Sequence, residues 1–248
     1  MGKRYHNPPV IEAVCEFRFD PSSPWDMAMP GLMYERLKEK YPKRRQVSAV
    51  DVIVSTEEPL KQKILRNDRL HFLSADDKAI VQVGPHLLAV NRLAPYSSWE
   101  SFFPSIQYAF SVYRETADPK ALVRVGLKYV NRIIFPKAAF SLEDYFEFYP
   151  FLGSRLPQLL QNFFLGVEFS FESGRDGLRL QMQTAASEQD NTYSFLLDLD
   201  HFAVGAAKVS FDYVFNWLEL AHARIEDVFE GCLKEAIRQR FGVAEESS

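Results

Sequence analysis

Glycine is scarce in this sequence and never clusters. The 11 glycines among 248 residues are scattered along the chain, and none of them forms the closely spaced pattern that cradles phosphates in a P-loop or a dinucleotide fold. We therefore expect neither nucleotide hydrolysis nor NAD chemistry. Histidine and cysteine are also few, at five and two, and they lack the spacing of metal ligands. The sequence thus predicts no metal and no cofactor.

The sequence also lacks long apolar runs. No stretch reaches the ~18 apolar residues of a membrane-spanning helix, and the first ten residues contain no apolar core of a signal peptide. The two cysteines, Cys15 and Cys232, are far apart in the chain, and we interpret them as reduced, buried thiols rather than as one long-range disulfide. These features predict a soluble cytoplasmic protein without a membrane partner.

The sequence also has no excess of basic residues over acidic ones. Lys and Arg number 29 against 33 Asp and Glu, which gives a net charge of −4. This balance disfavours nucleic acid as a partner but leaves room for a local basic patch. The densest basic run is Lys43-Arg44-Arg45. We interpret it as a solvated loop between a helix and a strand, with a phosphate contact as the alternative.

Hydrophobic residues, by contrast, are abundant and well patterned. They make up 47% of the chain, with 21 Phe, which predicts a large and well-filled core. The central stretch from Ala121 to Phe135 alternates, with Val125, Leu127 and Tyr129 on one face and basic residues on the other. A period of two with β-branched and aromatic residues predicts a half-buried strand. At ~3.3 Å per residue it would be about 45 Å long.

The remaining elements follow from periodicity and from turn residues. The Asn67-Asp68 pair sits where a tight turn is expected, and Ser98 is a candidate N-cap. Other strands are predicted at 11–19, 47–54, 61–66, 69–74, 79–83, 87–93, 163–172, 177–185 and 192–201. Helices are predicted at 32–41, 99–116, 141–148, 155–162 and, as one long terminal helix, 210–240.

This order of elements predicts an α+β fold. We expect two tandem β-α-β-β-β-α-like halves, 1–119 and 120–248, with largely antiparallel sheets and the long C-terminal helix packed on the sheet. Such a plan amounts to an internal duplication, although residue identity between the halves is slight. The halves would pack closely, and whether they form one domain with a continuous sheet stays open.

Two rows of charge are the main candidates for a binding site. Arg124, Lys128 and Arg132 leave one face of the central strand, and Asp198 and Asp200 leave one face of a later strand. If the two strands share a sheet, the acidic and basic rows face each other. The simpler interpretation is a set of cross-strand ion pairs. The alternative is the polar floor of a concave binding surface.

His222 is the candidate for catalysis. It lies on the apolar face of the predicted terminal helix, with Glu226 four residues later and Glu219 three residues earlier. We interpret it as a buried structural histidine, with a general base in a cleft as the alternative. No Ser or Cys has the surroundings of a nucleophile, so a catalytic triad is disfavoured. For Glu12, we favour a role in ordering the N-terminus, through a bond from Arg or Tyr, over catalysis.

Four segments together carry a family resemblance. They are Tyr5-x-Asn7-Pro8-Pro9-Val10-x-Glu12-Ala13, Gly126-x-Lys128-Tyr129-x-Asn131-Arg132-Ile133, Leu197-Asp198-Leu199-Asp200, and His222-x-x-Ile225-x-x-x-Phe229 leading to Arg240-Phe241-Gly242. With them the chain resembles a sporadically distributed family of uncharacterised bacterial proteins of about this length. The resemblance implies a bacterial cytoplasmic protein of patchy distribution, as seen for genes of mobile or defence-related neighbourhoods. It implies no activity.

Three functions stay open at this point. The first, which we favour, is a non-enzymatic binding or interaction protein for a small apolar ligand or a protein partner, held between sheet and helix. The second is a nucleic-acid-associated factor, whose binding would depend strongly on salt. The third is a hydrolase or transferase built around His222. A homodimer is compatible with all three.

Overall fold

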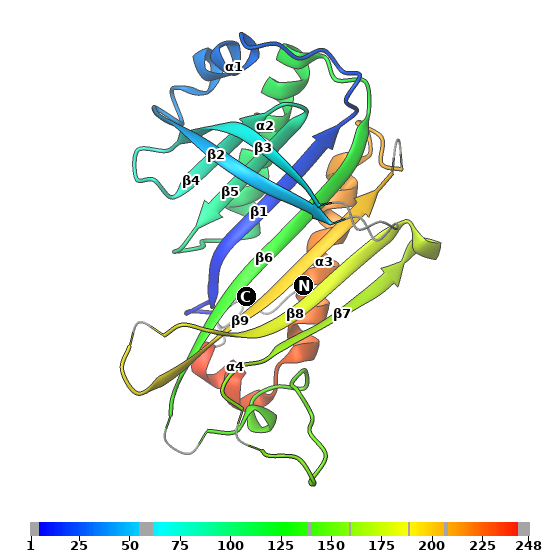
Figure 1. Ribbon diagram of the computed structural model, residues 1–248. Coiled ribbons are helices and arrows are strands. Elements are labelled where there is room, and N and C mark those ends of the chain that lie inside the picture. Colours follow the sequence, from blue (N-terminus) through cyan, green and yellow to red (C-terminus); the bar gives the residue numbers. More distant parts are fainter. Residues whose placement is uncertain are drawn as a thin grey trace, which may run out of the picture.

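One antiparallel sheet organises the molecule (Figure 1). The computed structural model describes residues 5–54, 62–137, 140–158, 160–187, 189–205 and 208–242, and within β2 and β3 it leaves out the side chains of 49–68. The first elements are β1 (Val10–Phe19), α1 (Met29–Leu37), β2 (Lys43–Val54), β3 (Gln62–Leu73), β4 (Ala79–Gly84), β5 (Leu87–Leu93) and α2 (Trp99–Ala117). Those that follow are β6 (Leu122–Pro136), β7 (Phe164–Phe171), β8 (Asp176–Ala185), β9 (Thr192–Val204), α3 (Val214–Cys232) and α4 (Glu235–Phe241). The class is α+β, as predicted.

The strand order is β2-β3-β4-β5-β1-β6-β9-β8-β7, and every pairing between named strands is antiparallel. Strands from residues before Pro119 thus lie on one side of the sheet, and strands after it lie on the other. The two sides meet where β1 pairs with β6. At 15 residues, β6 is the longest described strand, and it contacts β1 on one side and β9 on the other.

Alternation along the central strands separates a core face from a polar face. On β6, Leu127, Tyr129 and Phe135 are at most 5% exposed, as the period-two pattern predicted. On β1, Cys15 and Phe17 are fully buried on the same side of the sheet. Helices α2 and α3 cover this side (Figure 1). Because a strand sends successive side chains to opposite faces, the charged residues between these positions point away from the helices.

Aromatic side chains fill the space between the sheet and the helices. Phe110 of α2 packs against Phe17 of β1, with ring centroids 4.6 Å apart, and against Phe215 of α3, at 5.4 Å. Phe19 stacks on Tyr113 at 4.3 Å. These rings occupy the region in which the sequence placed a small apolar ligand, so the helix–sheet interface is core.

Two predictions near the first hairpin are wrong. Asn67 and Asp68 do not turn the chain, because β3 runs unbroken from Gln62 to Leu73. Lys43-Arg44-Arg45 is not a loop, because it opens β2. The reason is shared: β2 and β3 pair along their whole lengths, from Lys43↔Leu73 to Val54↔Gln62. Hydrogen bonds to a partner strand outweigh a local turn preference.

The prediction of one long terminal helix is also wrong, because the helix is interrupted after Cys232. Leu233 and Lys234 are extended, and α4 then begins at Glu235. The interruption satisfies backbone groups of a distant segment, because Glu147 N–H donates to Cys232 O at 2.8 Å and Lys234 N–H donates to Tyr145 O at 2.8 Å. Since 145–147 lies in the 140–163 loop, no local pattern could signal this break.

The two helices predicted inside that loop do not form among its described residues. Residues 141–148 contain only one short 3-10 turn, Leu142–Asp144, and the described part of 155–162 contains no helix.

Ser98 does occupy the N-cap position of α2, but its side chain makes no capping bond. Its carbonyl instead accepts a bond from the Ser101 hydroxyl at 2.9 Å.

Both cysteines are free and buried, as predicted. Burial raises the pKa of the Cys15 thiol, and it raises the pKa of the Cys232 thiol to about 12. A protonated, enclosed thiol is a poor nucleophile.

Among the described helices, none combines the length and the apolar character needed to cross a bilayer.

The aromatic core makes Phe110 a sensitive position. We expect Phe110→Ala to lower the free energy of unfolding by about 3–5 kcal/mol, because it leaves a cavity among Phe17, Phe211 and Phe215. Urea unfolding followed by circular dichroism measures the change. Phe151→Ala is the matched control, because Phe151 is 82% exposed and its loss should change stability by less than about 0.5 kcal/mol. Equal effects of the two changes would contradict this account of the core.

Candidate binding face of the sheet

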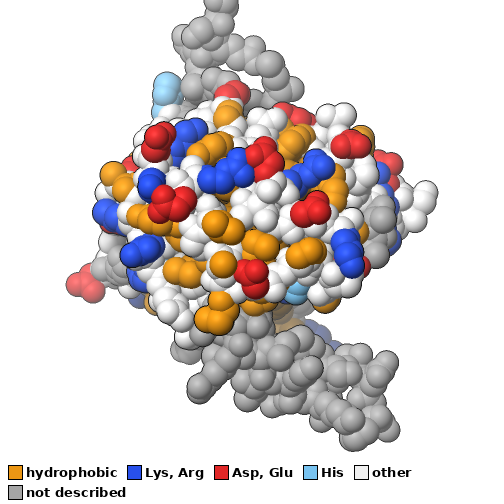
Figure 2. Space-filling model, turned by 90° about the horizontal axis from the view of Figure 1, so that it is seen from above, with side chains coloured by type: hydrophobic (Ala, Val, Ile, Leu, Met, Phe, Trp, Pro, Cys, Tyr) orange, Lys and Arg blue, Asp and Glu red, His pale blue; other side chains and the backbone are white. Residues whose placement is uncertain are grey.

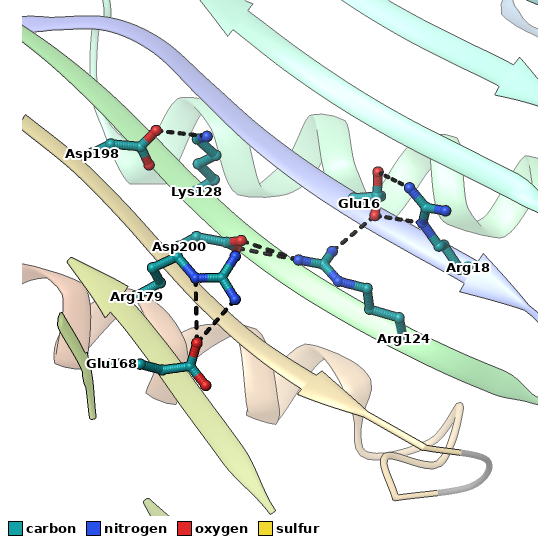
Figure 3. A network of polar contacts seen from close by, with 8 residues as sticks. All are labelled: Glu16, Arg18, Arg124, Lys128, Glu168, Arg179, Asp198 and Asp200. Carbon is teal, nitrogen blue, oxygen red and sulfur yellow. Dashed lines mark hydrogen bonds and ion pairs between the residues drawn. The ribbon is translucent and has the colours of Figure 1, made fainter. Parts of the chain in front are cut away.

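The face of β1, β6, β9, β8 and β7 that points away from α2 and α3 carries a continuous set of charged side chains, and we call it the polar face. Figure 3 shows eight of these residues, contributed by all five strands. Their positions follow from register, because Lys128 of β6 lies opposite Asp200 of β9, which lies opposite Arg179 of β8. Arg179 in turn lies opposite Glu168 of β7.

Arg124 is the centre of this network. Its guanidinium donates to Glu16 of β1 at 2.8 Å and to Asp200 of β9 at 3.1 Å. To reach both, the side chain lies back over its own strand at Gly126. A Cβ placed on Gly126 would come within 2.6 Å of Arg124 Nη1, closer than real Cβ contacts come. The missing side chain of Gly126 is therefore what allows one arginine to bridge β1 and β9.

Phe202 of β9 supports the same region. It lies opposite Gly126 on one side and Gly177 on the other, and a Cβ on Gly177 would come within 2.7 Å of its ring. The guanidinium carbons of Arg124 and Arg179 lie 5.6 Å and 5.4 Å from the ring centroid. A planar cation at this distance from a ring is attracted to it. Two glycines and one aromatic ring thus position both arginines.

Further ion pairs extend the network to both sides. Lys128 contacts Asp198 at 2.6 Å, Arg179 contacts Glu168 at 2.9 Å, and Arg18 contacts Glu16 at 2.9 Å. The structure therefore brings together four of the five residues that the sequence singled out, as cross-strand ion pairs. The fifth, Arg132, lies farther along β6 opposite Leu196.

Burial on the polar face is greatest around Arg124 and decreases towards β7. The side chains of Glu16 and Asp200 are 21% and 17% exposed, while Glu168 is 51% exposed. Burial raises the pKa of Asp200, and the charges of Arg124 and Lys128 offset this only in part. Burial acts on Glu16 too, but the Arg18 hydrogen bond and the Arg124 charge outweigh it and lower the pKa of Glu16. The centre of the network is thus more desolvated than its edge.

A shallow hollow of about 230 Å³ lies at one end of the polar face. Arg18 of β1, Arg69 of β3 and His86 line it, so the β2–β3 hairpin reaches over this end of the sheet. For Glu12, also on β1, the side-chain bond seen among the described residues comes from an amide rather than from Arg or Tyr. Glu12 accepts a bond from Asn91 Nδ2 at 2.7 Å. Other residues order the N-terminus, because Tyr5 donates to Glu230 at 2.6 Å.

His222 lies on the helix side of the sheet, inside a packed cluster. Its ring stacks on Trp99 with centroids 4.4 Å apart, and its Nε2 lies 3.6 Å from Glu226. Glu219 is not its partner, because that carboxylate accepts the Trp99 indole N–H at 2.9 Å. Burial lowers the pKa of His222 to about 4. Among the described residues, those that line the two hollows of about 230 and 310 Å³ do not include His222.

A second buried polar cluster lies under α3, and no pattern in the sequence signals it. Asp176 accepts bonds from Arg175 at 2.7 Å, from Trp217 at 3.1 Å and from Arg224 at 3.0 Å. His201 is fully buried beside it, and burial lowers the pKa of this histidine to about 4. The saturated bonds of Asp176 indicate a structural role, tying the start of β8 to α3.

Comparison with known proteins adds no identification. A scan against protein-family models and a search of curated proteins both found no match. Among the described residues, no group of three His, Cys, Asp or Glu side chains could hold a metal ion.

Replacing Gly126 should disrupt the network at its centre. In Gly126→Ala, the new methyl group displaces the Arg124 guanidinium and weakens its bonds to Glu16 and Asp200. We expect the free energy of unfolding to fall by about 1–3 kcal/mol, as when a half-buried charge loses its partner. Chemical denaturation measures this. Gly166→Ala is the matched control on β7, because its nearest contact would be an ordinary 3.4 Å. A fully stable Gly126→Ala would contradict the proposed role of this glycine.

Acid should destabilise the fold through His222. Its folded pKa of about 4 lies below the usual value of 6.5, so the unfolded chain binds more protons between these values. The contribution of neutral His222 to the free energy of unfolding is therefore fully present above pH 6.5 and is lost as the pH falls towards 4. At pH 5.5 the loss is about 1.4 kcal/mol. Urea unfolding at pH 7 and 5.5 should show a smaller difference in His222→Gln than in the wild type. An unchanged difference would show that His222 protonates freely in the folded state.

Proposed function

We propose that this chain is a non-enzymatic binding protein that docks a protein partner on its polar face. The observation that carries the proposal is that the described helices cover only one face of the sheet around β1, β6, β9, β8 and β7. Helices α2 and α3 lie on one face (Figure 1), no described helix lies over the other, and that other face carries an ordered charge network. Interspersed charges of fixed geometry favour one partner through electrostatic complementarity and disfavour others.

A protein partner fits this surface better than a small apolar ligand. Sites for drug-sized ligands are usually enclosed, mainly apolar hollows of about 300–1,000 Å³. Of two hollows around the described residues, one measures about 230 Å³, below this range, and the other measures about 310 Å³, at its lower limit. Both are open to solvent and have charged residues in their linings. The helix–sheet interface, where the sequence placed a small apolar ligand, is filled by aromatic rings.

Nucleic acid is the weaker alternative because the cations of the polar face have carboxylate partners. Arg124, Lys128 and Arg179 each contact an acidic side chain. Neutralised cations release few counterions from a phosphate backbone, so the electrostatic gain is small. On the surface seen in Figure 2, described basic and acidic side chains are likewise interspersed rather than gathered by sign.

The proposal includes the internal duplication and the family membership predicted from the sequence. In each half the last strand pairs with the first, β5 with β1 and β9 with β6, and a helix follows the last strand. This shared order supports a duplication. Membership of the sporadically distributed bacterial family rests on the four sequence segments.

Site-specific crosslinking tests the docking surface. A photo-crosslinking residue in place of Lys128, on the polar face, should give a discrete adduct with another protein in the producing cells. The same residue in place of Leu32, which is 54% exposed on α1, is the control and should give no such adduct. Excess unlabelled wild-type protein should compete for the adduct, whereas an Arg179→Glu variant should compete at least tenfold less well.

Three outcomes would contradict the proposal. They are identical adducts at both positions, no adduct at Lys128, or equal competition by the Arg179→Glu variant. An adduct with twice the mass of the chain identifies a second copy rather than a different partner. Circular dichroism of each variant checks that the fold is retained.

A further inference from the structure

Strand β7 is an unprotected edge of the sheet. It pairs with β8 on one side only and ends the strand order (Figure 1). Its residues are mostly exposed, including Phe164 at 62%, Val167 at 38% and Phe169 at 42%. The strand contains no Lys, Arg or Pro, which usually prevent an edge from pairing with another chain. The opposite edge, β2, begins with Lys43-Arg44-Arg45 and has that protection.

The free hydrogen-bonding groups of β7 belong to its even-numbered residues. Phe163 O accepts from Thr184 N–H of β8 at 3.2 Å, and the register continues with Phe164 opposite Gln183. In an antiparallel pair, every second residue bonds to the same neighbour. Odd-numbered residues therefore bond to β8, and the N–H and C=O groups of Phe164, Gly166, Glu168 and Ser170 point outward.

Charge and length select one symmetric register for pairing two β7 strands. In such a pair, a two-fold axis relates the two strands. Because the outward-pointing groups belong to every second residue, they meet only when this axis passes through a residue and not between two residues. Centring on Glu168 places two carboxylates opposite each other, which is unfavourable. Centring on Gly166 leaves Phe169, Ser170 and Phe171 opposite residues before the strand. Centring on Val167 keeps the carboxylates apart and pairs every β7 residue except Phe171 within the strand. Glu168 then lies opposite Gly166, and Phe164 lies opposite Ser170.

We propose that a second copy of this chain pairs with β7 in this register, making one sheet that continues across two molecules. Val167 meets the partner's Val167 at the two-fold axis, and Leu165 meets the partner's Phe169 beside it. These apolar contacts lie on the helix side of the sheet, where Val167 and Phe169 are exposed in the single chain. Glu168 keeps its contact with Arg179 on the polar face. The strand is therefore complementary to itself in shape, hydrogen bonding and charge.

Single cysteines test both the dimer and its register. In Val167→Cys, the two new thiols face each other across the axis in a non-hydrogen-bonded pair, with their Cα atoms about 4.5 Å apart, and a disulfide can form at this Cα separation. Mild oxidation should give mostly a crosslinked dimer on a non-reducing gel. Phe169→Cys is the matched control, because its two copies lie about 13 Å apart in this register and should crosslink at least tenfold less. The native Cys15 and Cys232 are buried.

Sedimentation measures the unmodified protein. The wild type should sediment at about twice its 28.6 kDa, and Val167→Lys should sediment as a monomer because it places two ammonium groups together at the axis. Leu32→Lys on α1 should remain dimeric. A wild type that stays monomeric at 100 μM, or crosslinking of Phe169→Cys that equals that of Val167→Cys, would overturn the proposal. The polar-face experiment uses Lys128 on β6, so the two proposals can fail independently.

Discussion

The pairing of β1 with β6 is the constraint on which the rest of the structure depends. It joins the strands before Pro119 to those after it, so that nine described strands share one set of backbone hydrogen bonds. It also aligns the alternation of the two strands, with Cys15 beside Leu127 on the helix side and Glu16 beside Gly126 on the polar side. A shift by one residue would exchange the two faces of one strand. The aromatic core and the charge network therefore depend on the same register.

The two faces of the sheet solve different physical problems. On the helix side, burial of rings such as Phe17 and Phe110 supplies the hydrophobic stabilisation, and close packing leaves little room for a ligand. On the polar side, ion pairs between half-buried groups contribute less, because desolvation offsets much of their attraction. What they supply is geometry, because Arg124 is held between Glu16 and Asp200 and cannot turn freely. The helix side therefore supplies most of the stability, and the fixed geometry of the polar side is the basis for proposing that it recognises a partner.

Interactions between distant segments explain the elements that were predicted wrongly. The Asn67-Asp68 pair favours a turn, yet a full-length partner strand keeps it extended. The helical pattern continues past Cys232, yet the backbone of 145–147 takes up the groups at which the helix breaks. The polar network shows the same limit. Lys128, Asp198 and Asp200 could be found from their spacing, whereas Glu16 and Arg179 have no local signal, because their relevance depends on which strands are neighbours.

By itself, the sequence determined the α+β class, the central strand and the core residues of its buried face. These follow from the period of the hydrophobic pattern, which is a local property that a single chain displays. Only the tertiary structure decided that β6 lies between β1 and β9, that Arg124 crosses Gly126, and that His222 stacks on Trp99. The physical reason is that strand order and side-chain contacts join residues far apart in the chain, such as Tyr5 and Glu230, which are 225 positions apart. Spacing along the chain carries no information about such pairs.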